Sequence, residues 1–317
     1  MYTVTFYSFK GGVGRTMALM NVAYDLVKRG CNVTVLDFDL EAPGLQSFNE
    51  LSECNKKGLQ DYVLEYVRSE GKILPDIKEF IHKTKNKNNS KNPLSGNLWF
   101  VPASKTGQFQ EIEWAKLYKE FKGFLLFEEL KLQIEHHTNS DYLLIDSRTG
   151  YTDHSSICTR QLPDLITGVF FPNSQNIDGL NDVINTARQV AVENEKKLPV
   201  VFVASRLPVG DDESGSLKEK LDYAENQLIK GKDSVYPELL TLHHNSKTEL
   251  LDQLILVNYS SKGVVQLKNE YEKLSETIQY HNENSELGNV VFLESILAHK
   301  KNLNDENDLS FFVDLIL

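Results

Sequence analysis

Short apolar runs alternate with amphipathic segments along the first two thirds of the chain. Runs rich in β-branched and aromatic residues are typical of buried strands, whereas apolar residues that recur every three or four positions are typical of helices. The first pattern predicts strands at Val4–Tyr7, Asn32–Phe38, Leu98–Pro102, Tyr142–Ile145, Leu165–Phe171 and Pro199–Ser205. The second pattern predicts helices at Leu19–Val27, Leu59–Val67, Ile73–Ile81, Phe121–His136 and Ile177–Val192. Because strands and helices alternate, we expect an α/β fold, a doubly wound and mostly parallel sheet with helices on both faces.

The pattern changes beyond Gly210. Acidic amphipathic helices follow, among them Leu217–Ile229, whose apolar residues share one helical face. One more strand-like run, Asn289–Leu293, lies further along. We interpret residues 210–317 as an acidic helical extension, so that residues 1–317 form a single domain. A separate small domain is the alternative interpretation.

A polar segment interrupts the alternation at residues 82–97. It is rich in lysine and asparagine and has no apolar periodicity. A composition of this kind is typical of a loop that packs no apolar side against the rest of the protein. We therefore predict a mobile surface insertion at this place.

The composition is that of a chain that can bury a core. Hydrophobic residues make up 40% and charged residues 25% of the 317 positions, as in folded globular domains. The three cysteines (Cys31, Cys54 and Cys158) lie far apart and show no metal-binding spacing, so we predict neither a disulfide framework nor a zinc or iron–sulfur site. No run approaches the roughly 18 apolar residues of a membrane span. We expect a cytoplasmic protein.

The net charge of −11 is concentrated at one end. From Gly210 onward the chain has 20 acidic residues, 10 lysines and no arginine. This acidity argues against binding nucleic acid, because basic side chains have to neutralise the phosphates. It also argues against membrane binding by the apolar residues 309–317, because a membrane-surface helix carries basic residues on its polar face. Core packing and a protein interface remain as two interpretations of residues 309–317.

A glycine-rich segment, Phe9–Thr16, separates the first predicted strand from the first predicted helix. Glycines let backbone N–H groups curl around an anion, and a helix N-terminus adds its positive end, so phosphate would bind favourably here. The standard phosphate-loop pattern G-x-x-x-x-G-K-[ST] is broken twice. Phe9 replaces its first glycine, and Arg15 replaces its lysine.

The string from Lys10 to Thr16, KGGVGRT, resembles the deviant Walker A motif of the ParA/MinD family, in a KGGVGR variant. The resemblance implies a P-loop NTPase of the SIMIBI class that binds ATP with Mg²⁺ and forms a nucleotide-dependent homodimer. It also implies that Lys10 is a catalytic residue, which reaches the phosphates of the other subunit and stabilises charge on the transferring group. The nucleotide-binding residues that it implies in the loop are Gly11, Gly12, Val13, Gly14, Arg15, Thr16 and Met17.

Arg15 departs from the lysine of that family. An arginine keeps the positive charge and can bind phosphate oxygens bidentately, but its planar guanidinium is bulkier than a lysine ammonium. We expect nucleotide binding to be retained and hydrolysis to be slow or absent.

Two aspartates, Asp37 and Asp39, lie at the end of the second predicted strand. Side chains two residues apart in an extended chain point to the same side, and the carboxyl end of this strand lies beside the phosphate loop. The segment resembles switch I of the family. The resemblance implies that Asp39 is a catalytic residue, which positions or activates the attacking water, and that Asp37 supports the metal shell.

The fourth predicted strand delivers Asp146 into a polar loop, which resembles the Walker B motif. A carboxylate in that position helps to hold Mg²⁺. The following residues, up to Gly150, resemble switch II, in which a glycine can change its backbone conformation in response to the γ-phosphate. The metal ligands that the resemblance implies are Thr16, Asp37, Asp39 and Asp146.

The family commonly reads the base with an asparagine after the sixth strand, where this chain has Ser205 and Arg206. A guanidinium can stack on a base. We therefore include Ser205 and Arg206 among the nucleotide-binding residues, with ATP as the expected nucleotide and GTP as the alternative.

Together these motifs predict an ATP-dependent dimerising switch that controls a partner protein, with slow hydrolysis. The resemblance also suggests a role in a bacterial defence or conflict system. Two alternatives are a scaffold that binds nucleotide without hydrolysing it and a phosphotransferase similar to bacterial tyrosine kinases. The second alternative is weakened because the last tyrosine is Tyr280, and no tyrosine-rich tail follows it. We expect neither nucleic acid nor membrane as a partner.

Overall fold

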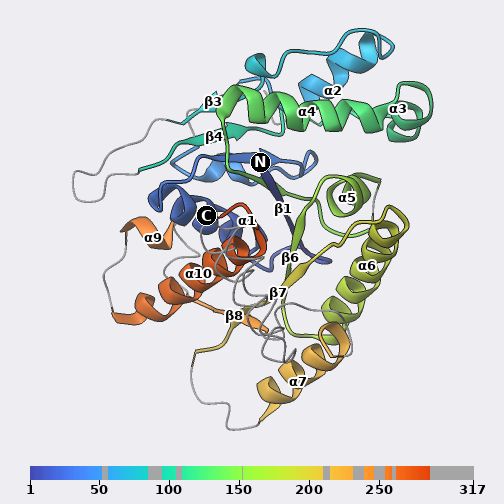
Figure 1. Ribbon diagram of the computed structural model, residues 1–317. Coiled ribbons are helices and arrows are strands. Elements are labelled where there is room, and N and C mark those ends of the chain that lie inside the picture. The colour runs from blue at the N-terminus through green and yellow to red at the C-terminus, as the bar shows by residue number, and fades with distance from the viewer. Residues whose placement is uncertain are drawn as a thin grey trace, which may run out of the picture. The chain divides into compact units, whose positions relative to one another are not determined.

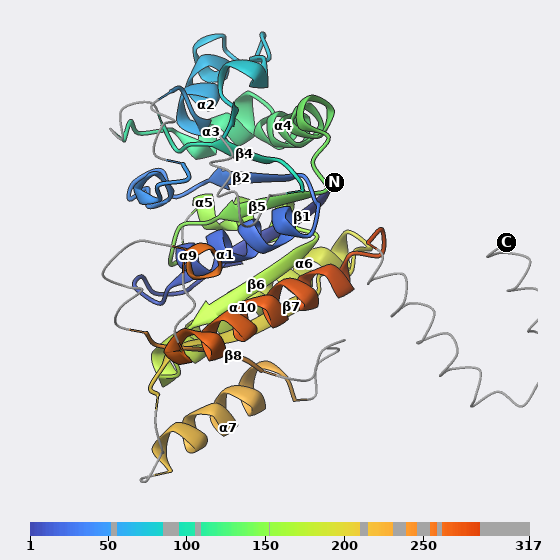
Figure 2. The same ribbon diagram turned by 90° about the vertical axis from the view of Figure 1, so that its left-hand side faces the viewer.

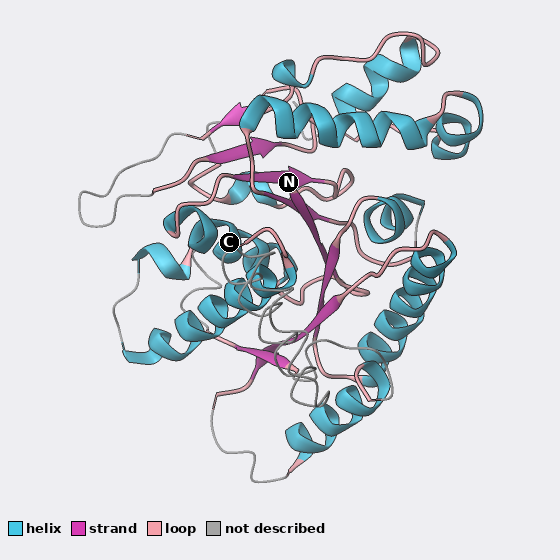
Figure 3. Ribbon diagram, viewed as in Figure 1, coloured by secondary structure: helices cyan, strands magenta, loops and turns pink. Residues whose placement is uncertain are grey.

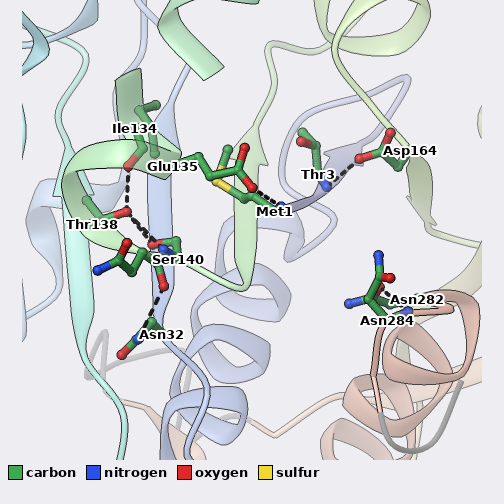
Figure 4. Close-up of polar contacts among 11 residues, drawn as sticks. Met1, Thr3, Asn32, Ile134, Glu135, Thr138, Ser140, Asp164, Asn282 and Asn284 are labelled. Atoms are coloured by element: carbon green, nitrogen blue, oxygen red, sulfur yellow. Dashed lines mark hydrogen bonds and ion pairs between the residues drawn. The ribbon is translucent and has the colours of Figure 1, made fainter. Parts of the chain in front are cut away.

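The computed structural model describes residues 1–51, 56–84, 95–104, 109–151, 153–209, 215–230, 239–245, 254–258 and 262–285. The chain groups into two compact units, Met1–Ser275 and Glu276–Leu317. In the second unit the described residues complete helix α10 (Lys262–His281) and form a turn, in which the Asn284 N–H donates to Asn282 Oδ1 at 3.1 Å (Figure 4).

One eight-stranded sheet forms the centre of the first unit (Figures 1 and 3). Its strands, in chain order, are β1 (Tyr2–Tyr7), β2 (Val33–Asp37), β3 (His82–Lys83), β4 (Leu98–Val101), β5 (Tyr142–Asp146), β6 (Leu165–Phe170), β7 (Val200–Leu207) and β8 (Leu240–His243). Their spatial order is β3-β4-β2-β5-β1-β6-β7-β8, and only β3 pairs antiparallel. This arrangement confirms the predicted doubly wound, mostly parallel α/β fold.

Helices cover both faces of the sheet, because each parallel strand pair is joined by a crossover. The α-helices are α1 (Arg15–Lys28), α2 (Leu59–Arg68), α3 (Trp114–Glu120), α4 (Gly123–Thr138), α5 (Asp153–Ser156), α6 (Ser174–Glu193), α7 (Ser216–Leu228) and α9 (Ile255–Asn258), in addition to α10. The short turns are η1 (Leu45–Ser47), η2 (Ile77–Glu79) and the π-helical η3 (Ile157–Gln161). Figures 1 and 2 show α1 and α9 on one face of the sheet and α6 on the other.

An aromatic cluster anchors α4 to the sheet. The Phe127 side chain is fully buried, and its ring lies 5.6 Å from the ring of Phe38 and 6.3 Å from those of Trp114 and Tyr118. Rings at such distances gain from edge and offset contacts in addition to their buried area. The cluster joins α3 and α4 to the end of β2, which leads directly into Asp39.

Polar contacts tie the loops at the amino ends of the strands (Figure 4). The Met1 ammonium pairs with Glu135 of α4 at 2.5 Å, and the Thr3 N–H donates to the Asp164 carboxylate at 2.8 Å. These contacts fix β1 at the edge opposite to the glycine-rich loop, which follows the carboxyl end of the same strand.

Several sequence predictions need correction. Residues 73–81 do not form a helix, since only the single turn η2 lies there, and the strand β3 begins at His82. Strand β8 and helix α3 were not predicted. Their runs, four and seven residues long, are too brief for periodicity to reveal.

Three other predictions fall on residues outside the described ranges. They are the strand at 289–293, the packing of 309–317 and most of the insertion at 82–97, of which residues 85–94 are not described. The interpretation of 1–317 as a single domain stays a prediction. Among the helices that the structure describes, none combines the length and the apolar character needed to cross a membrane.

We predict that Phe127→Ala destabilises the protein by roughly 3–5 kcal/mol, because it removes the central ring of the buried cluster. Urea unfolding measures this loss. Phe124→Ala is the matched control on the same helix, since the Phe124 side chain is 54% exposed, and it should change stability by no more than about 0.5 kcal/mol. Equal losses in the two variants would contradict the assigned packing.

Candidate nucleotide-binding site

The glycine-rich loop lies between β1 and α1 and faces open space. Gly12 and Gly14 have positive φ angles of 75° and 80°, which favour glycine. A Cβ atom placed on Gly11, Gly12 or Gly14 would meet no atom of the described residues within 4 Å. The first turn of α1 begins at Arg15, so its free N–H groups and the positive end of the helix adjoin this space. The loop is therefore shaped as a cradle for an anion.

Two carboxylates lie side by side at the carboxyl edge of the sheet. Strands β2 and β5 pair in register so that Asp37 stands opposite Asp146. Paired residues on neighbouring strands share one face, and here it is the face that α1 covers. Both aspartates are fully buried, and Asp39, two residues after Asp37, is 8% exposed. The predicted acidic residues thus come together beside the loop.

Arg15 neutralises part of this acidic cluster. Its Nε donates to Asp146 Oδ1 at 2.5 Å, and its Nη2 donates to Asp39 Oδ2 at 3.1 Å. Its neighbour Thr16 donates its hydroxyl to Asp146 Oδ2 at 2.7 Å. The first two residues of α1 therefore use both oxygens of Asp146, and the Arg15 side chain is almost completely buried.

The electrostatics of the cluster are unbalanced. Burial, and then the neighbouring Asp146 and Asp39, raise the pKa of Asp37 well above its usual value. Burial also raises the pKa of Asp39, although Arg15 opposes this shift. For Arg15 burial disfavours the charge, but the two carboxylates outweigh it and the pKa is raised. Three carboxyl groups therefore share one permanent positive charge.

Two buried polar atoms in the cluster, Asp37 Oδ2 and Arg15 Nη1, have no hydrogen-bond partner among the described residues. Buried polar groups are usually paired, so these atoms mark a place where a further polar group would be favourable. The oxygen atoms of the cluster belong to carboxylate and hydroxyl groups, which are suitable ligands for Mg²⁺. Among the described residues, however, no group of three or more His, Cys, Asp or Glu side chains is arranged to hold a metal ion.

Strand β7 supports the back of the loop. The Ser205 hydroxyl lies 2.6 Å from the Val13 carbonyl and 3.1 Å from the Phe170 carbonyl. Arg206, whose φ angle is 57°, donates from Nη1 to the Gly12 carbonyl at 2.7 Å. Both residues thus hold backbone carbonyls of the loop. Their contact with a base stays a prediction.

The remaining loop residues have separate surroundings. Lys10 is exposed, and its ammonium lies 5.3 Å from the centroid of the Phe9 ring. Val13 is buried, and the Met17 carbonyl accepts a hydrogen bond from Asn21 at 2.9 Å.

Phe9 is a functional candidate that sequence reasoning treated only as a broken glycine position. Its ring packs directly against Gly179 of α6, where an added Cβ would lie 2.3 Å from Phe9 Cδ1. The sequence offered one indication of this contact, because Phe9 lies in the loop and Gly179 lies inside a predicted helix, where a glycine is unusual. This contact joins the start of the loop to α6.

The predicted switch residues are linked to one another. The buried Tyr7 hydroxyl donates to the Gly150 carbonyl at 3.2 Å, and Gly150 has a φ angle of 78°. Burial raises the pKa of Tyr7, so its hydroxyl keeps the proton that it donates. Arg148 pairs with Glu41, which follows Asp39 closely. The segment after β5 is thus joined to β1 and to the segment after β2.

An open, glycine-rich loop between the first strand and the first helix, with acidic residues at two adjacent strand ends, is typical of P-loop nucleotide-binding proteins. A family model described as the CobQ/CobB/MinD/ParA nucleotide-binding domain matches residues 4–250. The chain belongs to this family.

Solved structures support the same fold at low sequence identity. A variant of McdA from Cyanothece in complex with ATP has a TM-score of 0.62 and 14% identity, covering 88% of this chain and 96% of that chain. The MinC:MinD cell division complex of Aquifex aeolicus has a TM-score of 0.56 and 18% identity, covering 86% of this chain and 95% of that chain. Cobyrinic acid a,c-diamide synthase of Mycobacterium smegmatis, with ADP and magnesium, has a TM-score of 0.59 and 13% identity, covering 90% of this chain and 96% of that chain. A search among curated proteins found no match.

We predict that the effect of Gly179→Ala on stability changes sign with the residue at position 9. In the natural protein the added methyl collides with the Phe9 ring, and overpacking of this kind costs about 1–3 kcal/mol. In a Phe9→Ala background the collision is gone, and the better helix propensity of alanine should stabilise α6 by up to about 1 kcal/mol. Urea unfolding of the four proteins in this cycle measures the coupling. The same effect in both backgrounds would refute the contact.

Proposed function

We propose that the protein is a Mg²⁺-dependent, ATP-binding switch that dimerises with nucleotide and controls a partner protein, with slow hydrolysis. One observation carries the proposal. Arg15 and Thr16, the first residues after the open loop, bond directly to Asp146 at the end of β5, and Arg15 also bonds to Asp39 in the segment after β2. A phosphate chain in the loop would therefore adjoin the acidic residues that such chemistry needs.

Each group in the site can be given a role. The backbone of Gly11 to Gly14 and the N-terminus of α1 would bind the phosphates, with Ser205 and Arg206 holding the loop in shape. Thr16 and Asp146 would hold Mg²⁺, with Asp37 in support. When bound, the ion supplies charge stabilisation to the phosphate oxygens.

Asp39 and Lys10 would carry the catalytic roles. Asp39 is the least buried of the three acids and follows the strand end, so it can orient a water molecule at the edge of the site. Lys10 is exposed, and its ammonium lies over the Phe9 ring. It is therefore available to the phosphates of a second subunit, where a positive charge would stabilise the transferring group.

Complexes of similar proteins favour these roles. McdA was solved with ATP, MinD with the partner protein MinC, and the diamide synthase with ADP and magnesium. For this chain, ATP, Mg²⁺, the homodimer, a cytoplasmic location and a regulated partner remain part of the proposal. GTP in place of ATP, a non-hydrolysing scaffold and a phosphotransferase are the alternatives, and a role in bacterial defence is one context.

We predict slow phosphate release by the natural protein with ATP and Mg²⁺, and release at the background rate by Asp39→Ala. Arg15→Lys should release phosphate faster. A lysine ammonium can pair with only one of the two carboxylates that Arg15 now engages, so the other carboxylate becomes available for the reaction. A phosphate-release assay measures the rates, and light scattering of the same samples measures the molar mass.

Lys10→Ala is the control for the dimer. It should still bind ATP but should not show the increase in mass that ATP produces in the natural protein. Release no faster than that of Asp39→Ala would favour the scaffold over the hydrolysing switch. A monomer under all conditions would refute the dimer.

A further inference from the structure

The acidic cluster has a cation of its own. Among the described residues, Arg15 is the one basic side chain bonded to Asp39 or Asp146. Its guanidinium joins the two carboxylates, one from the strand end of β5 and one from the segment after β2. The same Asp146 oxygens are those that a Walker B carboxylate would offer to a metal ion. We call the place between Asp39 and Asp146 the cation position. Arg15 lies there now, and a metal ion would bind at the same place.

The Arg15 guanidinium opposes a divalent ion at Asp146 by its charge and its position. Arg15 Nε donates to Oδ1 at 2.5 Å and the Thr16 hydroxyl donates to Oδ2 at 2.7 Å, so each oxygen of Asp146 already accepts a hydrogen bond. Mg²⁺ demands near-octahedral oxygen ligands at about 2.0–2.1 Å. An ion at that distance from Asp146 would also lie against the positive charge of Arg15. Metal entry is therefore unfavourable while Arg15 is bound to Asp146.

Arg15 has a strong reason to stay until another anion is present. Breaking a buried ion pair leaves an uncompensated charge, which is costly. Here departure would leave three carboxyl groups without a cation and would strand the guanidinium. A phosphate chain in the open loop gives the guanidinium a new partner, because arginine binds phosphate oxygens bidentately. A metal ion then supplies the carboxyl groups with a new cation.

We propose that Arg15 occupies the cation position in the nucleotide-free protein, so that a divalent metal ion enters only when phosphate draws Arg15 away. This inference rests on the proposed nucleotide site. It makes Arg15 the residue that determines whether metal binds alone. By thermodynamic linkage, nucleotide and metal strengthen the binding of each other by the same factor.

The test measures Mn²⁺ binding to the nucleotide-free protein. The electron paramagnetic resonance signal of free Mn²⁺ reports how much of the ion is unbound. Arg15→Met removes the charge and keeps the length of the side chain. It should bind Mn²⁺ at least about tenfold more tightly than the natural protein, which corresponds to about 1.4 kcal/mol. Equal Mn²⁺ affinity of the two nucleotide-free proteins would overturn the proposal.

Two further variants keep this test decisive. Arg29→Met is the matched control, because Arg29 pairs with the buried Asp25 at 2.7 Å at the other end of α1, and it should bind Mn²⁺ like the natural protein. If Arg15→Met does not fold, Arg15→Lys replaces it. The point charge of lysine engages one carboxylate instead of two, so its Mn²⁺ affinity should exceed that of the natural protein, and an unchanged affinity would overturn the proposal.

A separate measurement isolates the underlying site. Binding of a fluorescent ATP analogue in the presence of EDTA reports nucleotide binding without metal. If the analogue does not bind under any condition, the proposed function fails. If it binds and the nucleotide-free natural protein also binds Mn²⁺ as tightly as Arg15→Met, only the role of Arg15 fails.

Discussion

The contact between Arg15 and the carboxylates of Asp39 and Asp146 is the interaction on which the rest of the site depends. Parallel pairing of β2 and β5 in register forces Asp37 and Asp146 together on one buried face. A pair of buried acids would be unfavourable without a cation. The chain supplies that cation from the first residue of α1, whose bonds to Asp146 and Asp39 tie the phosphate loop to the end of β5 and to the segment after β2.

The topology explains why all these residues meet. In a doubly wound sheet, ligands bind at the carboxyl ends of the strands, where the connections diverge to opposite faces. Strand β1 lies at the centre, with β5 on one side and β6 on the other. The loop after β1 is therefore flanked by the acids on one side and, beyond β6, by the end of β7, whose Ser205 and Arg206 hold its carbonyls.

Much of this could be predicted from the sequence because the relevant signals are local. Alternating apolar runs predict the parallel sheet, and aspartates directly after two strands predict an acidic edge near a glycine-rich turn. Register and side-chain contacts are not local. The choice of Asp146 and Asp39 as partners of Arg15, and the fit of Phe9 against Gly179, depend on how distant segments pack.

The errors follow the same rule. Residues 73–81 have helical spacing, yet they contain Pro75, which has no N–H to donate, and only one turn forms there. The short edge strands β3 and β8 take their structure from the neighbours β4 and β7. Their identity as strands depends on pairing with those neighbours, which no window of sequence contains.

A crystal structure with Mg²⁺ and a non-hydrolysable ATP analogue would test the central claim most directly. The account predicts that the Arg15 guanidinium lies within hydrogen-bonding distance of phosphate oxygens, and that Mg²⁺ lies against Asp146 and Thr16 where Arg15 is now bound. A structure in which nucleotide and Mg²⁺ are bound while Arg15 still bridges Asp39 and Asp146 would contradict it.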